Sequence, residues 1–207
     1  MTYPVTLSET ELSAVNQILG AVGQAPITTL DQTNPDVAIA YDTLVEVNRE
    51  TQGEGWVFNT EREYPFTPDT NGEILIPGNV LMLDLSDLPQ NRGQDVVQRG
   101  GKLYNKTDHT FSWSDFTPPV YCDVVWLFEF VDTPQPFKDY ISAKASVIAA
   151  TKMIGDPNQY KLLKERELST RAMIVQYECE QGNYSMFGFP NGQNFYTSYQ
   201  PYTTLAR

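Results

Sequence analysis

The chain has 207 residues, of which 41% are hydrophobic and 19% are charged, and this is enough apolar material for a folded core. Acidic side chains number 26 and basic side chains 14, which leaves a net charge of −12. A general nucleic-acid binder presents a basic surface, so this class is disfavoured, and so is close contact with an anionic membrane. No apolar run approaches the length of about 18 residues that a transmembrane helix needs, and we expect no secretory signal.

The first fifty residues predict two helices. Ser8 and Glu11 match a capping box at the start of the first helix. The second helix is expected to begin after Asn34, since Pro35 suits the first helical position, and to end before Gly53. Apolar residues at helical spacing predict one buried face on each helix. The two faces consist of Leu12, Val15, Leu19 and Val22, and of Val37, Tyr41, Leu44 and Val47 or Asn48.

Residues 56–132 show a different pattern, in which short apolar runs alternate with turn residues. This pattern is typical of β-strands, and we expect six to eight short ones. The dipeptide Gly100-Gly101 predicts a two-residue hairpin turn between two of them. The expected strands lie at 56–58, 74–76, 80–83, 95–98, 102–104, 111–113 and 123–130.

The helical pattern returns after residue 132. A third helix is expected from Thr133-Pro134 and ends at Gly155, and Asp156 starts a fourth, with Gln159 completing a capping box. The fourth helix is predicted to run from Pro157 to Gln181, antiparallel to the third. The expected buried faces are Phe137, Ile141, Ala145 and Ile148 in the third helix, and Leu168, Ala172, Val175 and Cys179 in the fourth, with Ile174 and Tyr177 off that stripe.

These elements predict an α+β protein. Two helical hairpins, in residues 1–55 and 133–183, are expected to pack as a four-helix bundle, with a mainly antiparallel β domain inserted at 56–132. Residues 184–207 are expected to form an extended C-terminal arm, because the segment contains no Asp, Glu or Lys and is rich in aromatic residues. The arm either folds back on its own domain or, as we favour, binds a neighbouring subunit or another protein. Its expected interface residues are Tyr184, Phe187, Phe189, Phe195, Tyr196, Tyr199 and Tyr202.

No established catalytic, phosphate-binding or metal-binding motif is present in the sequence. His109 lies in a turn-like segment and is expected in a surface loop, so we predict no catalytic residue there. Cys122 and Cys179 are interpreted as buried free thiols in a reducing cytoplasm, since two distant cysteines without a nearby histidine do not suit zinc. The segment Arg99–Lys102 is better explained by a turn than by a phosphate loop. We therefore expect no catalytic, cofactor-binding or metal-binding residues.

An alternative is a carbohydrate-binding or carbohydrate-hydrolysing module in the β domain. Paired carboxylates are the residues a glycosidase needs, and aromatic rings such as Trp113 and Phe116 can stack on sugars. Surface solvation and core packing are the more common roles of these residues. A second alternative is a scaffold with a small-molecule pocket among the helices. The candidate carboxylate pairs are Glu61 with Glu63, and Asp84 with Asp87.

Five segments, in order along the chain, resemble the head-to-tail adaptors of short-tailed, autographivirus-type phages, the tail tubular protein A family. The resemblance spans most of the chain. Its segments are Glu11–Asn16 with Ile18-Leu19; Val47–Arg49 with Gly55–Asn59; Arg99–Tyr104; Pro136-Phe137 with Lys144–Ser146; and Tyr177-Glu178 with Gly182–Met186.

The resemblance implies a structural virion protein, made in the host bacterial cytoplasm and located at the junction of head and tail. It implies a ring of twelve copies between the portal protein and the tail nozzle protein, tail tubular protein B. The helical bundles would surround the channel for DNA ejection, and the C-terminal arm would embrace the portal. Because the chain is acidic, the viral DNA is expected to pass without specific binding. No enzymatic activity, cofactor or membrane is implied.

Overall fold

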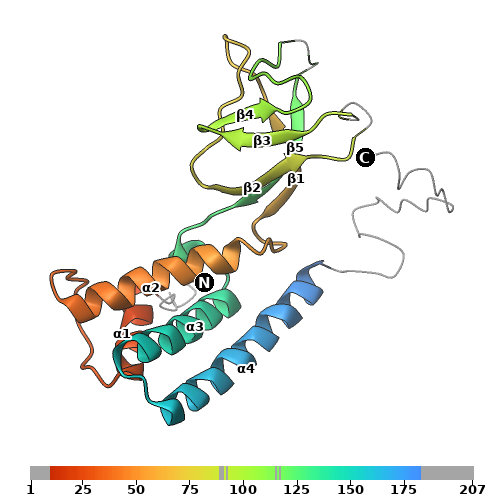
Figure 1. Ribbon diagram of the computed structural model, residues 1–207. Helices are drawn as coiled ribbons and strands as arrows, with labels where there is room; N and C mark the ends of the chain where they lie inside the picture. Colours follow the sequence, from red (N-terminus) through yellow and green to blue (C-terminus); the bar gives the residue numbers. More distant parts are fainter. Residues whose placement is uncertain (1–9, 89–90, 92, 115, 117, 183–207) are drawn as a thin grey trace, which may run out of the picture. The chain divides into compact units, whose positions relative to one another are not determined.

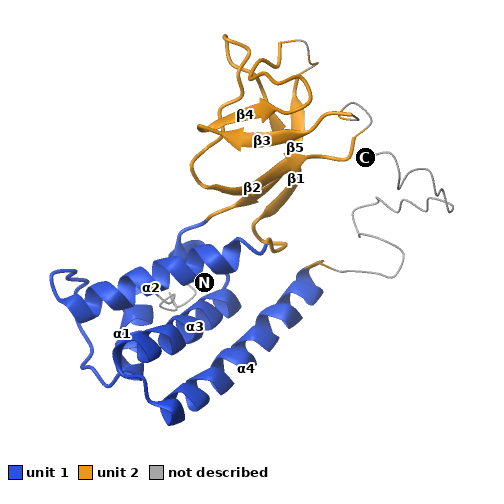
Figure 2. Ribbon diagram, in the orientation of Figure 1, with its two compact units in different colours: residues 1–54, 128–181 blue, residues 55–127, 182–207 orange. Residues whose placement is uncertain are grey.

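A computed structural model describes residues 10–88, 91, 93–114, 116 and 118–182 (Figure 1). These residues form two compact units, which Figure 2 colours separately. The first unit holds the described residues of 1–54 together with 128–181, and the second holds those of 55–127 and Gly182. The first unit is helical, and the second contains the strands, so a β unit is inserted between two helical segments of the sequence.

The structure has the four helices that the sequence predicts: α1 (Glu11–Ala21), α2 (Pro35–Gln52), α3 (Gln135–Met153) and α4 (Pro157–Gly182). The capping prediction for α1 is wrong, because the N-cap is Thr10, whose hydroxyl accepts a hydrogen bond from the Ser13 amide at 3.3 Å. Ser8 lies outside the described residues. The prediction for α2 is confirmed, since the Asn34 side chain accepts a hydrogen bond from the Asp36 amide at 3.0 Å.

Helix α3 lies at the centre of the helical unit, packed against both α1 and α2 (Figure 1). Alanine and serine residues occupy much of its surface and let neighbouring helices approach closely. The predicted faces of α1, α2 and α3 are confirmed, apart from half-buried Leu12, Tyr41 and Ile148. Their fully buried residues include Val15, Leu19, Val37, Leu44, Val47, Phe137, Ile141 and Ala145.

The predicted buried face of α4 is wrong. Ile174 is 0% exposed and Tyr177 packs edge-on against Phe137 of α3, with ring centroids 5.9 Å apart. By contrast Leu168 is 60% exposed and Val175 46% exposed. The helix therefore buries a different side from the one its apolar spacing indicates, with Glu167 and Thr170 flanking Ile174 on the buried side.

The predicted capping box of α4 is also only half present. Asp156 accepts a hydrogen bond from the Asn158 amide at 2.9 Å, as an N-cap does. The Gln159 side chain instead donates to the carbonyl of Ala21 at the end of α1. That bond ties the start of α4 to α1, a partner distant in the sequence.

The β unit contains five strands among its described residues: β1 (Thr60–Phe66), β2 (Val80–Leu85), β3 (Val96–Arg99), β4 (Lys102–Asn105) and β5 (Val120–Trp126). One sheet has the order β1-β5-β2, and β3 pairs with β4 in a two-stranded hairpin. Every pair is antiparallel, as predicted. Gly100 and Gly101 have φ values of 57° and 74°, which the predicted two-residue turn requires.

Four predicted strands are corrected by the structure. Residues 57–59 form a turn, in which the Trp56 amide donates to the Asn59 side chain at 2.8 Å. Segments 74–76 and 111–113 contribute isolated bridges. The last predicted strand begins and ends earlier, and Phe130 lies in a 3-10 helix. Short apolar runs therefore overestimate strand number, since they also supply buried loop residues.

Candidate functional site

The expected interface residues of the C-terminal arm, Tyr184 to Tyr202, lie outside the described residues. The structure therefore leaves these seven aromatic residues as an expectation from the sequence. The surfaces described below come from residues 10–182.

The candidate glycosidase carboxylates lie on or beside the three-stranded sheet. Glu61 and Glu63 belong to β1, Asp84 belongs to β2, and Asp87 follows that strand. The register places Asp84 directly opposite Asp123 of β5, a residue that the sequence analysis did not single out. Strand pairing between segments about forty residues apart creates this carboxylate pair, so spacing along the chain did not reveal it.

The two carboxylates of this cross-strand pair have different surroundings. Asp123 accepts hydrogen bonds from the Ser86 hydroxyl at 2.6 Å and from the Glu63 amide at 2.9 Å. Asp84 is exposed and accepts a hydrogen bond from the amide of the next residue, Leu85, at 2.9 Å. Like charges directly opposite on a sheet repel each other, so this pair forms a locally acidic surface.

Of the two aromatic residues proposed for sugar stacking, Trp113 is buried in the β unit and Phe116 is half-buried beside it. Trp113 is 1% exposed, and its indole N–H donates to the carbonyl of Leu103 at 3.0 Å. The Phe116 ring lies 4.9 Å from the Trp113 ring, centroid to centroid. A buried indole offers no face to a sugar, so Trp113 is a core residue.

The hairpin β3–β4 carries a preorganised aromatic and cationic cluster. The guanidinium of Arg99 lies 4.2 Å from the centroid of the Tyr104 ring, and the Phe111 ring packs edge-on against Tyr104 at 4.8 Å. The Lys102 ammonium forms an ion pair of 2.5 Å with Glu73. The turn prediction already implied part of this geometry, since a two-residue turn must place Arg99 opposite Lys102. The observed pairing of Arg99 with Lys102 confirms that this segment is a turn and not a phosphate loop.

The two cysteines differ, and one prediction about them is wrong. Cys122 is buried as expected, but Cys179 is an exposed free thiol on α4. Burial raises the pKa of Cys122 to about 12, and the nearby carboxylates of Asp123 and Asp84 add to the effect. Cys122 therefore stays protonated and unreactive near neutral pH.

This difference predicts that one thiol per chain reacts quickly with a thiol reagent such as DTNB at pH 8. The second thiol, Cys122, is expected to react after denaturant is added, because unfolding removes both its burial and its raised pKa. The variant Cys179→Ser should abolish the fast phase. Two equally fast phases in the native protein would contradict the burial of Cys122.

His109 is exposed in a turn, as the sequence predicts, at a positive φ of 56°. Within the described part of the chain, no three potential ligands among His, Cys, Asp and Glu gather to hold a metal ion. No helix of that part is both long enough and apolar enough to cross a membrane.

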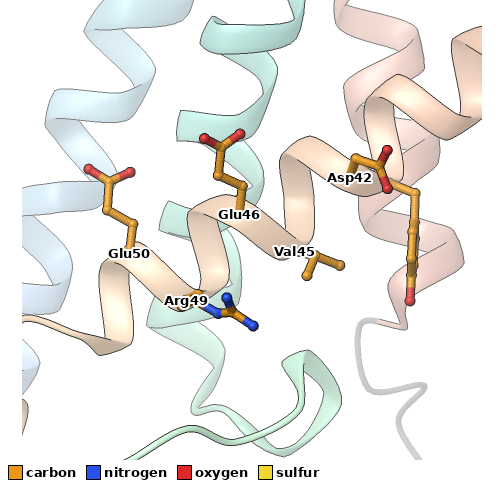
Figure 3. Close-up of a pocket in the computed structure, with 6 residues that line it drawn as sticks. Asp42, Val45, Glu46, Arg49 and Glu50 are labelled. Carbon is orange, nitrogen blue, oxygen red and sulfur yellow. The ribbon is translucent and has the colours of Figure 1, made fainter. Parts of the chain in front are cut away.

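An open pocket lies along the outward face of α2 (Figure 3). Glu46 and Glu50 extend to one side of the helix, where they pair with Lys152 and Lys144 of α3 at 3.6 Å and 3.0 Å. Arg49 extends to the other side. The remaining lining residues are Tyr41, Asp42 and Val45. This mixed, open surface does not resemble a concave site for a small molecule.

Helix α4 exposes several apolar side chains. Leu162 and Met173 are exposed along with the stripe that the sequence predicted to be buried. Apolar side chains this numerous on one exposed helix are typical of a surface that contacts another protein. The helix is held in the helical unit by polar contacts too, including the ion pair of Arg171 with Glu54 at 2.5 Å.

The family model described as tail tubular protein matches residues 12–184 of the chain. Tail tubular protein A of Klebsiella phage KP34 is 24% identical over 178 residues, which cover 84% of this chain and 90% of that protein. The family match includes both the helical segments and the inserted β unit. The chain therefore belongs to the tail tubular protein family and is a structural component of a phage tail.

Proposed function

We propose that the chain assembles into a ring of twelve copies that joins the portal vertex to the tail nozzle protein, tail tubular protein B. The observation that carries this proposal is the exposed apolar surface of α4, including Leu168 and Val175, in a chain of a tail tubular family. A closed ring of identical subunits needs two different surfaces that fit each other on neighbouring copies. Exposed apolar side chains on a helix supply one candidate for such a surface.

The charge of the chain suits a channel through which DNA passes. With a net charge of −12, its surface repels phosphates, so DNA would slide through the ring without being retained. Several of the lysine and arginine side chains are already neutralised by ion pairs within the described chain, including Lys102, Lys144 and Arg171. The ring would thus line part of the ejection channel, and we assign no catalytic step to it.

In this proposal the chain acts as three parts. A helical domain, residues 1–55 with 133–183, surrounds the channel, and a β domain, residues 56–132, is inserted within it. The arm at 184–207 anchors each subunit on the portal or on a neighbouring copy through its aromatic side chains.

Light scattering tests the ring proposal directly. The purified full-length chain would be measured alone and after mixing with the portal ring of the same phage. A complex whose mass corresponds to one portal and twelve added chains is the expected result. A chain that remains separate from the portal at micromolar concentration would refute the proposal.

A truncation tests the role of the arm. Deletion of residues 195–207 should leave the two described units folded, as judged by circular dichroism, but should prevent stable loading on the portal. The single change Tyr199→Ala is expected to weaken loading less, because several aromatic anchors share the binding energy. Full occupancy of portals by the truncated chain would show that the arm is not the anchor.

A further inference from the structure

The hairpin β3–β4 turns one of its faces outward. In its register Val97 pairs with Tyr104 and Arg99 pairs with Lys102, while Leu103, on the alternate side, is fully buried. Leu75 bridges to Lys102 and is 60% exposed, so it lies on the same outward face. The hairpin face, defined as Leu75, Arg99, Lys102, Tyr104 and Phe111, combines two cations with two aromatic rings and an exposed leucine.

The composition of this hairpin face is typical of a protein-binding surface. Arginine, tyrosine and phenylalanine are enriched at interfaces, and Arg99 is held in place by its stack on Tyr104. Lys102 is partly neutralised by Glu73, whereas no ion pair of Arg99 is present among the described residues. Arg99 therefore offers a guanidinium that is already oriented and available for a carboxylate of a partner.

The three-stranded sheet also turns one face outward. Val120, Cys122, Val124 and Trp126 of β5 are buried, so the intervening Asp123 and Val125 lie on the other face. Asp84 and Met82 of β2 are their register partners, and Met82 is 57% exposed. The sheet face, defined as Met82, Asp84, Asp123 and Val125, combines two carboxylates with two apolar side chains.

The two faces are complementary in charge and in apolar content. The hairpin face has a free guanidinium beside aromatic rings and a leucine, whereas the sheet face has two carboxylates without a cation partner in the described ion pairs. The chain as a whole is strongly acidic, so copies brought together repel unless a cationic surface lies between them. The sheet face of a second copy carries carboxylates of the kind that could pair with Arg99.

We propose that the hairpin face of one copy docks on the sheet face of the next copy, with Arg99 paired to Asp84. Because the two faces are different surfaces of the same unit, the contact is head-to-tail and repeats around a ring. Leu75 and Phe111 then cover the exposed Met82 of the neighbour. The inference rests on the proposed ring and names the surfaces through which its β units meet.

Charge reversal tests the contact on portal rings loaded with the full chain. The variants Arg99→Glu and Asp84→Arg each place like charges together at every junction. We expect each variant alone to need at least about tenfold more protein for half-maximal loading, because reversal of an interfacial charge is repulsive. The double variant, which restores opposite charges at each junction, should load like the unmodified chain.

Mixing the two single variants separates contact between copies from contact within one chain. In a ring where the two variants alternate, two kinds of junction occur. At one, the hairpin face with Arg99→Glu meets the sheet face with Asp84→Arg. At the next, the unchanged Arg99 meets the unchanged Asp84, so every junction pairs opposite charges. An equimolar mixture is therefore expected to load like the unmodified chain, although each variant alone needs at least about tenfold more protein. The control Asp132→Arg makes the same charge change on the helical unit, at an exposed residue, and should leave loading unchanged.

The possible outcomes distinguish this inference from the ring proposal. Normal loading by both single variants would overturn the docking of these faces while leaving the ring intact. Loss of loading that neither the mixture nor the double variant restores would also overturn it, provided that thermal unfolding shows folded chains. Failure of the unmodified chain to load the portal would refute the ring and this contact together.

Discussion

The substitution Trp113→Ala is expected to lower the free energy of unfolding of the β unit by about 3–5 kcal/mol, the range for removing a buried aromatic side chain. The indole is 1% exposed, packs on Phe116 and donates its N–H to the Leu103 carbonyl. Truncation leaves a cavity and removes that hydrogen bond from a buried carbonyl. Urea unfolding followed by circular dichroism measures the loss without depending on tryptophan fluorescence.

Two matched changes show whether burial causes this loss. Trp113→Phe keeps a ring but removes the N–H donor, and should cost about 1–2 kcal/mol less than truncation to alanine. Phe111→Ala removes a ring that lies at the surface, and should cost no more than about 1 kcal/mol. Equal effects of Trp113→Ala and Phe111→Ala would contradict the position of Trp113 in the core.

The second large effect is expected at Gln52, a fully buried polar residue at the end of α2. Its side chain amide donates to the Phe128 carbonyl at 2.9 Å and accepts from the Phe128 amide at 2.8 Å. It also donates to the Asn48 side chain at 2.8 Å, which in turn donates to the same carbonyl at 3.2 Å. These bonds attach the backbone of Phe128 to α2, at the point where the chain re-enters the helical unit after the β insertion.

Gln52→Ala should therefore destabilise the helical unit by about 2–4 kcal/mol, since it removes several buried hydrogen bonds and leaves a cavity. Gln176→Ala is the matched control, because Gln176 is an exposed helical glutamine bonded to Glu180 within one turn. That control should change stability by less than about 0.5 kcal/mol. A loss at Gln52 no larger than at Gln176 would show that the Phe128 bonds contribute little.

Local signals explain which predictions from the sequence are confirmed. The start of α2 depends on an Asn-Pro-Asp segment whose side chains act on their own backbone, and the β3–β4 turn depends on two adjacent glycines with positive φ. Neither effect needs a distant partner. For α1, the local pattern identified the helix but not its cap, which is Thr10 and not the predicted Ser8.

Helix α4 shows where local pattern fails. Its apolar residues lie at several angles around the helix, so the spacing of Leu168, Ala172 and Val175 did not identify the side that packs on α3. Ile174 is fully buried and Tyr177 is half-buried, because Phe137 and its neighbours lie on their side. The apolar side that remains exposed then becomes a candidate for assembly.

The sequence by itself determined the α+β class, the four helices, the insertion between the second and third, the glycine hairpin and the acidic charge. These follow from composition, from periodicity and from contacts between residues close in the chain. Tertiary structure alone decided which side of α4 is buried and that Asp84 lies opposite Asp123. Each of these depends on segments distant in the chain coming together, and a short stretch of sequence contains no information about its distant partner.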